Sequence, residues 1–204
     1  MLFSDTYQTI TQATEGVFRD KGSKFIAYAY PIKSETEVKE ITAKLRAEHN
    51  KARHFCWAIR LTPDRNVHKF NDDGEPSGTA GRPILNALLS ADVTNILVVV
   101  VRYFGGTLLG VPGLINAYKT ATVDALNTAE IITKTVNDVY ELEFDYLTMN
   151  DVMRVVKDEQ LNILSQNFDT CCKLSFEVRK ANLNQVMGKF DKIEGLKTLY
   201  LGTV

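Results

Sequence analysis

Residue types that could do chemistry gather in two glycine-rich segments, Asn71–Arg82 and Arg102–Gly110. The first carries three carboxylates, a serine and an arginine, and the second begins with an arginine followed by two aromatic residues. Glycine serves where backbone bends through positive φ or approaches another group closely, and loops of this kind often carry function. The candidate binding residues are therefore Arg102, Tyr103, Gly105, Gly106, Arg82, His54, Asp72, Asp73, Glu75 and Ser77.

The three carboxylates of the first segment are oxygen donors of the type that binds divalent cations. The spacing of Asp72, Asp73 and Glu75 does not match an EF-hand loop, and no second acidic cluster accompanies them. We therefore assign no metal site. The interpretation that we favour is that these acids form local turns and pair with Arg82 or Arg102.

The glycines of the second segment lie between a predicted strand and a predicted helix, where backbone N–H groups can bind a phosphate. Arg102 would add a fixed cation, and Tyr103 or Phe104 could stack on a base. The segment lacks the Lys-Ser/Thr ending of a P-loop and the spacing of a dinucleotide fingerprint. The alternative is structural: the strand end buries one aromatic ring and turns Arg102 toward Asp72 or Asp73.

No catalytic residue or cofactor is assigned. Ser77 lies in Pro-Ser-Gly-Thr, which is not a nucleophile elbow. His54 and Cys56 share one face of a predicted strand, but no third residue to orient a base is identifiable. A small phosphate- or metal-dependent enzyme that uses the acidic loop 72–75 and the glycine loop 105–110 stays open as an alternative.

Composition indicates an ordinary globular protein of 204 residues, 45% of them hydrophobic, with a net charge of −1. No run approaches the roughly 20 apolar residues of a membrane span, and residues 1–10 lack the pattern of a signal peptide. Three cysteines make no disulfide framework. We expect a cytoplasmic protein with no membrane partner and no disulfide-linked partner. Residues 17–69 nevertheless hold twelve Lys or Arg against six Asp or Glu, which allows a basic face.

Hydrophobic patterns predict two units that divide between residues 137 and 138. For the first unit they predict a strand over 7–20, its hairpin partner over 24–32, a helix over 34–50, a half-buried strand over 53–61, a short helix from Pro83, a central strand over 96–101, a longer helix through Leu114 and Ala125, and a last strand over 131–136. Residues 62–82 show no periodic pattern, which is typical of a functional or mobile loop. The second unit has the order βαββαβ of a ferredoxin-like sandwich.

Four segments of the chain resemble a known family. Asn71–Leu85 and Val98–Ala117 are similar to the two signature segments of the Impact/YigZ family, and Lys24–Ala27 and His54–Ala58 resemble its earlier blocks. The likeness covers residues 15–130, and the full layout resembles the bacterial YigZ type.

The resemblance implies an α+β fold. Its parts are a ribosomal-protein-like left-handed βαβ domain over 1–137 and a ferredoxin-like domain over 138–204, similar to the last domain of elongation factor G. Eukaryotic members of the family regulate translation initiation, whereas bacterial members have no settled activity. For this chain the resemblance implies a non-catalytic protein that binds RNA, the ribosome or a translation-associated protein; a protein-interaction adaptor is the alternative. The expected contact centre is Arg102, Tyr103, Gly105 and Gly106, with Arg82 and His54 beside it.

Overall fold

The computed structural model of the chain describes residues 5–169 and 171–204. It shows an α+β fold with two compact units, one spanning Tyr7–Lys134 and the other Thr135–Val204 together with the described residues 5–6. Residues 1–4 and 170, which fall inside the expected domains, lie outside the described residues. The expected limits at 137 and 138 stay a prediction.

The first unit is built on a sheet in which every neighbouring pair of strands is antiparallel. Its order is β2 (Thr14–Asp20), β3 (Ser23–Pro31), β6 (Ile96–Tyr103), β4 (His54–Leu61) and β5 (Val67–Asn71). Because β3 and β4 both run antiparallel to β6, they are parallel to each other, and helix α1 (Thr36–Glu48) connects them. This connection is the expected βαβ unit.

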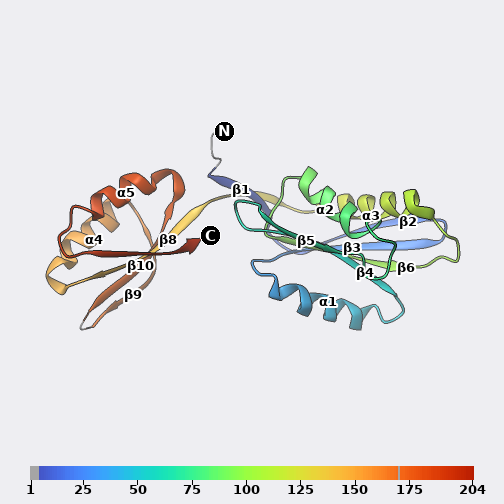
Figure 1. Ribbon diagram of the computed structural model, residues 1–204, viewed down its shortest axis with the longest axis horizontal. Helices are drawn as coiled ribbons and strands as arrows, with labels where there is room; N and C mark the ends of the chain where they lie inside the picture. The colour runs from blue at the N-terminus through green and yellow to red at the C-terminus, as the bar shows by residue number, and fades with distance from the viewer. Residues whose placement is uncertain (1–4, 170) are drawn as a thin grey trace. The chain divides into compact units, whose positions relative to one another are not determined.

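Helices cover both faces of this sheet (Figure 1). Helix α1 packs on one, the α1 face, and helices α2 (Gly81–Ser90) and α3 (Gly110–Asn127) pack on the other, the α2–α3 face. On β4, Phe55 lies in the core of the α1 face and Cys56 in the core of the α2–α3 face. The expectation of a half-buried strand over 53–61 is therefore wrong. The face that carries Cys56 and Ala58 is buried as well, because helices α2 and α3 cover it.

Two other expectations for the first unit need correction. The segment 7–20 is not one strand: β1 (Thr6–Ile10) pairs with β7 (Ile131–Thr135), and the chain then changes sheet and continues as β2. Strand composition is the same on both sides of the change, so composition alone does not reveal it. The segment 62–82 contains β5, whose residues are all exposed, so burial imposes no period-two pattern on it.

The second unit confirms the predicted ferredoxin-like topology. Its main elements are β8 (Asn137–Phe144), α4 (Met149–Asp158), β9 (Asn162–Phe168), β10 (Cys172–Arg179), α5 (Leu183–Phe190) and β11 (Lys197–Thr203), with single 3-10 turns at Tyr146–Thr148 and Lys180–Asn182 before the helices. The sheet order is β11-β8-β10-β9, with antiparallel neighbours. Side chains from the helices and from one sheet face form a separate core around Phe176 and Phe190.

Among the residues that the structure describes, no helix has the length and apolar composition that crossing a bilayer requires.

We predict that Gly16→Ala destabilises the first unit by about 1–3 kcal/mol, because overpacking forces backbone to move. A Cβ added at Gly16 would lie 2.1 Å from the amide nitrogen of Ala125, where α3 crosses β2. Urea unfolding followed by circular dichroism measures the change. Gly188→Ala is the control: a Cβ there meets nothing within 4 Å in helix α5, so stability should stay constant or rise. Equal stability of Gly16→Ala and wild type would contradict the close contact.

Candidate functional site

A buried ion pair brings the two glycine-rich segments together. Nη1 of Arg102, at the end of β6, donates to Oε1 of Glu75 over 2.6 Å, and the two side chains are only 7% and 3% exposed. The hydroxyl of Tyr118 on α3 donates to the same Oε1 over 2.7 Å. The two segments are therefore side by side, and one carboxylate oxygen joins the first loop, β6 and α3.

Cys56 packs against the buried group formed by Arg102, Glu75 and Tyr118, but its thiol is protonated and therefore does not act as a nucleophile. Its sulfur lies 3.0 Å from the carbonyl oxygen of Asp72 and 3.3 Å from the hydroxyl of Tyr118. Burial raises the pKa of the Cys56 thiol and that of the Tyr118 hydroxyl far above their usual range. Since the thiolate is the reactive form of cysteine, Cys56 is a packed, protonated thiol.

Two aromatic rings flank the guanidinium of Arg102. Its Cζ lies 5.5 Å from the ring centroid of Phe25 and 5.6 Å from that of Phe104. Arg102 Nε is buried and has no hydrogen-bond partner in the described part of the chain. Arg102 is thus held by one carboxylate and by rings, which suits a residue that positions the loops.

Asp72 organises the first loop from inside. Its carboxylate accepts hydrogen bonds from the N–H groups of Gly78 (2.9 Å), Ala80 (3.1 Å) and Gly81 (2.8 Å). These amides lie at and before the start of α2, where unpaired donors favour an anion. The carboxylate of Asp72 therefore completes the amino end of the helix.

Asp73 connects the same loop to the sheet and to α1. Its carboxylate accepts the N–H of Phe55 over 2.7 Å and pairs with Arg46 over 2.7 Å. Its carbonyl oxygen lies 2.9 Å from Nδ1 of His54, so Nδ1 carries the hydrogen. All three acids of the loop are bonded to protein donors, and no group of metal-ligating side chains occurs among the described residues.

The favoured interpretation, in which these acids pair with Arg82 or Arg102, agrees with the ion pair between Glu75 and Arg102. The separate expectation that Arg102 turns toward Asp72 or Asp73 is wrong. Arg82 and Ser77 are exposed, and neither makes an ion pair or side-chain hydrogen bond within the described ranges. Sequence spacing does not determine which of three neighbouring acids points into the protein.

Packing and backbone conformation explain why glycine occupies positions 105 and 106 of the second loop. A Cβ added at Gly105 would lie 2.0 Å from the carbonyl carbon of Gly22 in the β2–β3 turn, and the Gly105 N–H donates to Oγ of Ser23 over 3.1 Å. Gly106 has a φ of +89° and open space around it. Gly105 is thus required for close backbone packing and Gly106 for its backbone conformation, and Gly106 remains accessible.

Arg102 and Tyr103 lie on opposite faces of the sheet, because neighbouring strand residues alternate. The Tyr103 hydroxyl is 2.8 Å from Nδ1 of His49, and Nε2 of His49 is 2.9 Å from the hydroxyl of Tyr28. This chain of hydrogen bonds belongs to the α1 face, whereas Arg102 packs on Phe25 in the core of the α2–α3 face. The expected contact centre is therefore divided between two faces.

Sequence reasoning missed a line of basic residues at this end of the sheet, on the α1 face. Arg19 on β2 pairs in register with Lys24 on β3, and Lys24 pairs with Tyr103 on β6. Arg53 directly precedes His54, whose register partner on β6 is Arg102. A line across four neighbouring strands therefore contains, in order, Arg19, Lys24, Tyr103 and Arg53. We call its three basic residues, Arg19, Lys24 and Arg53, the cationic row.

Among the described residues, the cationic row has no ion-pair partner. Arg19 and Arg53 are exposed and Lys24 is half-buried. None of the three makes an ion pair in the part of the chain that the structure describes. The signal in the sequence is the basic excess over 17–69, but only the strand register shows where the charges meet.

We predict that Arg102→Ala lowers the free energy of unfolding of the first unit by about 3–5 kcal/mol, because it leaves Glu75 as an unpaired buried charge. Urea unfolding followed by the fluorescence of Trp57, the single tryptophan, measures this change. Arg82→Ala, which removes the same charge from an exposed position, should stay within about 0.5 kcal/mol of wild type. Similar stabilities for both variants would show that the pair contributes little.

A second prediction concerns alkaline pH. Burial, helped by the charge of Glu15, raises the pKa of Tyr28 to about 12 from a usual 10.0. The folded state therefore holds this proton more tightly, so the associated stability is present below pH 10 and is lost as pH rises through 12. Ultraviolet titration of tyrosinate should show a component near pH 12 that Tyr28→Phe removes and that Tyr146→Phe, at a position 72% exposed, retains. Loss of the component in both variants or in neither would contradict the assignment.

Comparisons with known proteins agree on one family. The model of the Impact N-terminal domain matches residues 21–126. An IMPACT family member of Haemophilus influenzae is 36% identical over 84% of this chain and 79% of its own. IMPACT family member YigZ of Escherichia coli is 32% identical over 83% of this chain and 84% of its own. The crystal structure of a hypothetical protein matches 98% of both chains at 29% identity, with a TM-score of 0.76. The chain therefore belongs to the Impact family.

Proposed function

We propose that this protein is a non-catalytic, cytoplasmic regulator of translation that binds RNA through its cationic row. The observation that carries the proposal is the line of basic side chains at one end of the first sheet, which make no ion pair with any described residue. Membership of the Impact family supports the translational setting, since the resemblance implies that eukaryotic members regulate translation initiation.

The geometry of the row suits a phosphate backbone. Neighbouring strands lie about 4.8 Å apart, so Arg19 and Lys24 are close enough to contact one strand of RNA together. Cations that already pair with protein carboxylates gain little from a phosphate, whereas unpaired ones release counterions from the nucleic acid when they bind it. A net charge of −1 for the chain makes this a local attraction.

Tyr103 and the second loop complete the proposed surface. The half-buried ring of Tyr103 lies in the row and is held by its hydrogen bond to His49, so it offers a fixed platform on which a base stacks. Gly106 and its neighbours follow directly in the chain and remain open. In this proposal Arg102, Glu75, Asp72, Asp73 and His54 position the loops, and the exposed Arg82 and Ser77 are secondary contacts on the other face.

We predict that the triple variant Arg19→Ala, Lys24→Ala, Arg53→Ala binds a labelled single-stranded RNA at least tenfold more weakly than wild type at low salt. Because each phosphate contact adds about 0.7 to the salt slope of single-strand binding, the slope should fall by about 2. Fluorescence anisotropy at several salt concentrations measures both, and cosedimentation with purified ribosomes repeats the comparison.

The matched control removes three exposed lysines elsewhere: Lys119→Ala, Lys157→Ala, Lys180→Ala. This control should keep both affinity and slope. Equal loss in the two triple variants would mean that only the overall charge matters, and absent or salt-insensitive RNA binding by wild type would end the proposal. Retention of a protein partner after nuclease treatment, without RNA affinity, would favour the adaptor alternative.

A further inference from the structure

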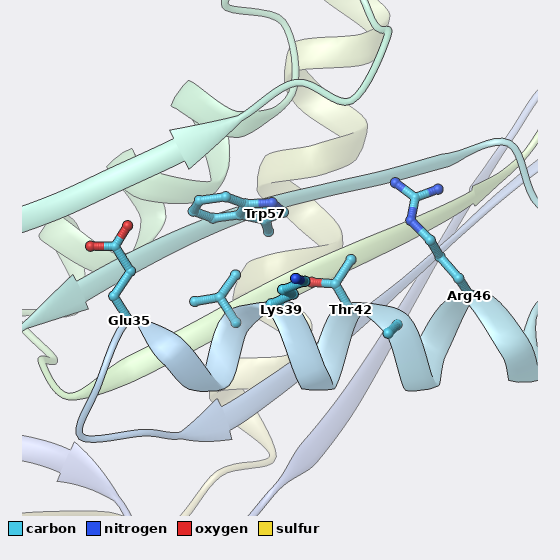
Figure 2. Close-up of a pocket in the computed structure, with 7 residues that line it drawn as sticks. Glu35, Lys39, Thr42, Arg46 and Trp57 are labelled. Carbon is cyan, nitrogen blue, oxygen red and sulfur yellow. The ribbon is translucent and has the colours of Figure 1, made fainter.

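A groove of about 440 Å³ lies on the α1 face, between helix α1 and strand β4. Figure 2 shows the indole of Trp57 lying over the helix, with Glu35 and Arg46 at the two ends of the groove and Lys39 and Thr42 between them. Trp57 is half-buried and is the one tryptophan of the chain. A large ring that is only partly covered is an energetically favourable contact for a partner.

Two polar groups of the groove lack partners. Oγ1 of Thr42 is buried and has no hydrogen-bond partner among the described residues. The indole N–H of Trp57 likewise has no acceptor in the described part of the chain. Because buried polar groups are normally hydrogen-bonded, the buried Thr42 hydroxyl has hydrogen-bonding capacity left for a ligand, and the indole N–H of Trp57 is a further available donor.

The groove borders an open sheet edge. Strand β5 is the last strand of its sheet, pairs only with β4 among the described residues, and is exposed at all its positions. In register, Asn71 faces Trp57 and Lys69 faces Ile59, so the edge runs along the groove. An exposed edge presents unpaired N–H and C=O groups that accept a further strand.

The charge of this edge selects its partner. Lys69 lies on the α1 face and pairs with Glu35 over 2.6 Å. Lys39, which lines the groove, is exposed and makes no ion pair within the described ranges. A further strand beside β5 would therefore meet an unpaired cation on its α1 face, which an acidic side chain complements.

The same charge disfavours a second copy of this chain. Antiparallel pairing of β5 with itself about its middle residue places Lys69 opposite Lys69. Like charges directly opposite each other destabilise a strand pair. A different, acidic chain suits the edge better.

We propose that β5 and the groove under Trp57 form a docking site for an extended acidic peptide segment of a partner protein. The segment adds to β5 as a further strand. On the α1 face of the added strand, an apolar side chain contacts Trp57, a carboxylate lies near Lys39 and a polar group reaches Thr42. The site is distinct from the cationic row and does not rest on RNA binding.

A library of random 12-residue peptides displayed on phage, selected on the intact protein, tests this site. Enriched peptides should carry apolar and acidic residues together at alternate positions, so that both kinds lie on the face toward the groove, and their synthetic forms should shift the emission of Trp57 in a saturable way. Hydrogen exchange should show protection of the amides of Val67–Asn71 when such a peptide is bound.

Charge reversal at the rim provides the matched comparison. Lys39→Glu should weaken the selected peptides about tenfold and Lys39→Gln less, whereas Lys119→Glu, an equal charge change on α3, should leave affinity within twofold. Circular dichroism confirms that each variant is folded. The proposal would be overturned if no peptide were enriched, or if the enriched peptides contained no acidic residues. It would also be overturned if hydrogen-exchange protection appeared outside β5, if RNA and not peptide shifted the emission of Trp57, or if self-association of the protein blocked peptide binding.

Discussion

The pairing of Arg102 with Glu75 is the interaction on which the arrangement of the first unit depends. A charge removed from water is tolerated only when an opposite charge and hydrogen bonds compensate for it. Glu75 receives both, from the guanidinium and from the hydroxyl of Tyr118, at a single oxygen. The pair requires the acidic loop, the end of β6 and the middle of α3 to meet at one point, and Asp72 and Asp73 then fix the rest of the loop around it.

Strand alternation divides this end of the sheet into two chemical surfaces. On the α2–α3 face the buried charges of Arg102 and Glu75 satisfy each other, so that side serves to hold the loops. On the α1 face, the row of Arg19, Lys24 and Arg53 has no ion-pair partner within the part of the chain that the structure describes, and the buried Thr42 hydroxyl in the groove has no hydrogen-bond partner there. Both proposed contacts therefore belong to the α1 face, on which Tyr103 is the side chain of the expected contact centre.

Local patterns predicted most elements, because the helices and the buried strands each have a strong period or run of their own. They also predicted that the acids of the first loop pair with Arg82 or Arg102, and the structure has the pair of Glu75 with Arg102. They did not predict β5, which is fully exposed, or the change of sheet between β1 and β2. The cationic row was missed because Arg19, Lys24 and Arg53 fall into one line only through the register of four strands.

The contact between Gly105 and Gly22 fixes the main chain of the second loop, yet its tip has no packing role. Leu108 is 82% exposed, only three residues beyond the point of closest approach. Replacement of that side chain changes what the molecule presents to solvent at almost no cost in stability. Evolution can therefore alter the chemistry of this tip, and with it the choice of ligand, through single substitutions while the scaffold beneath stays the same.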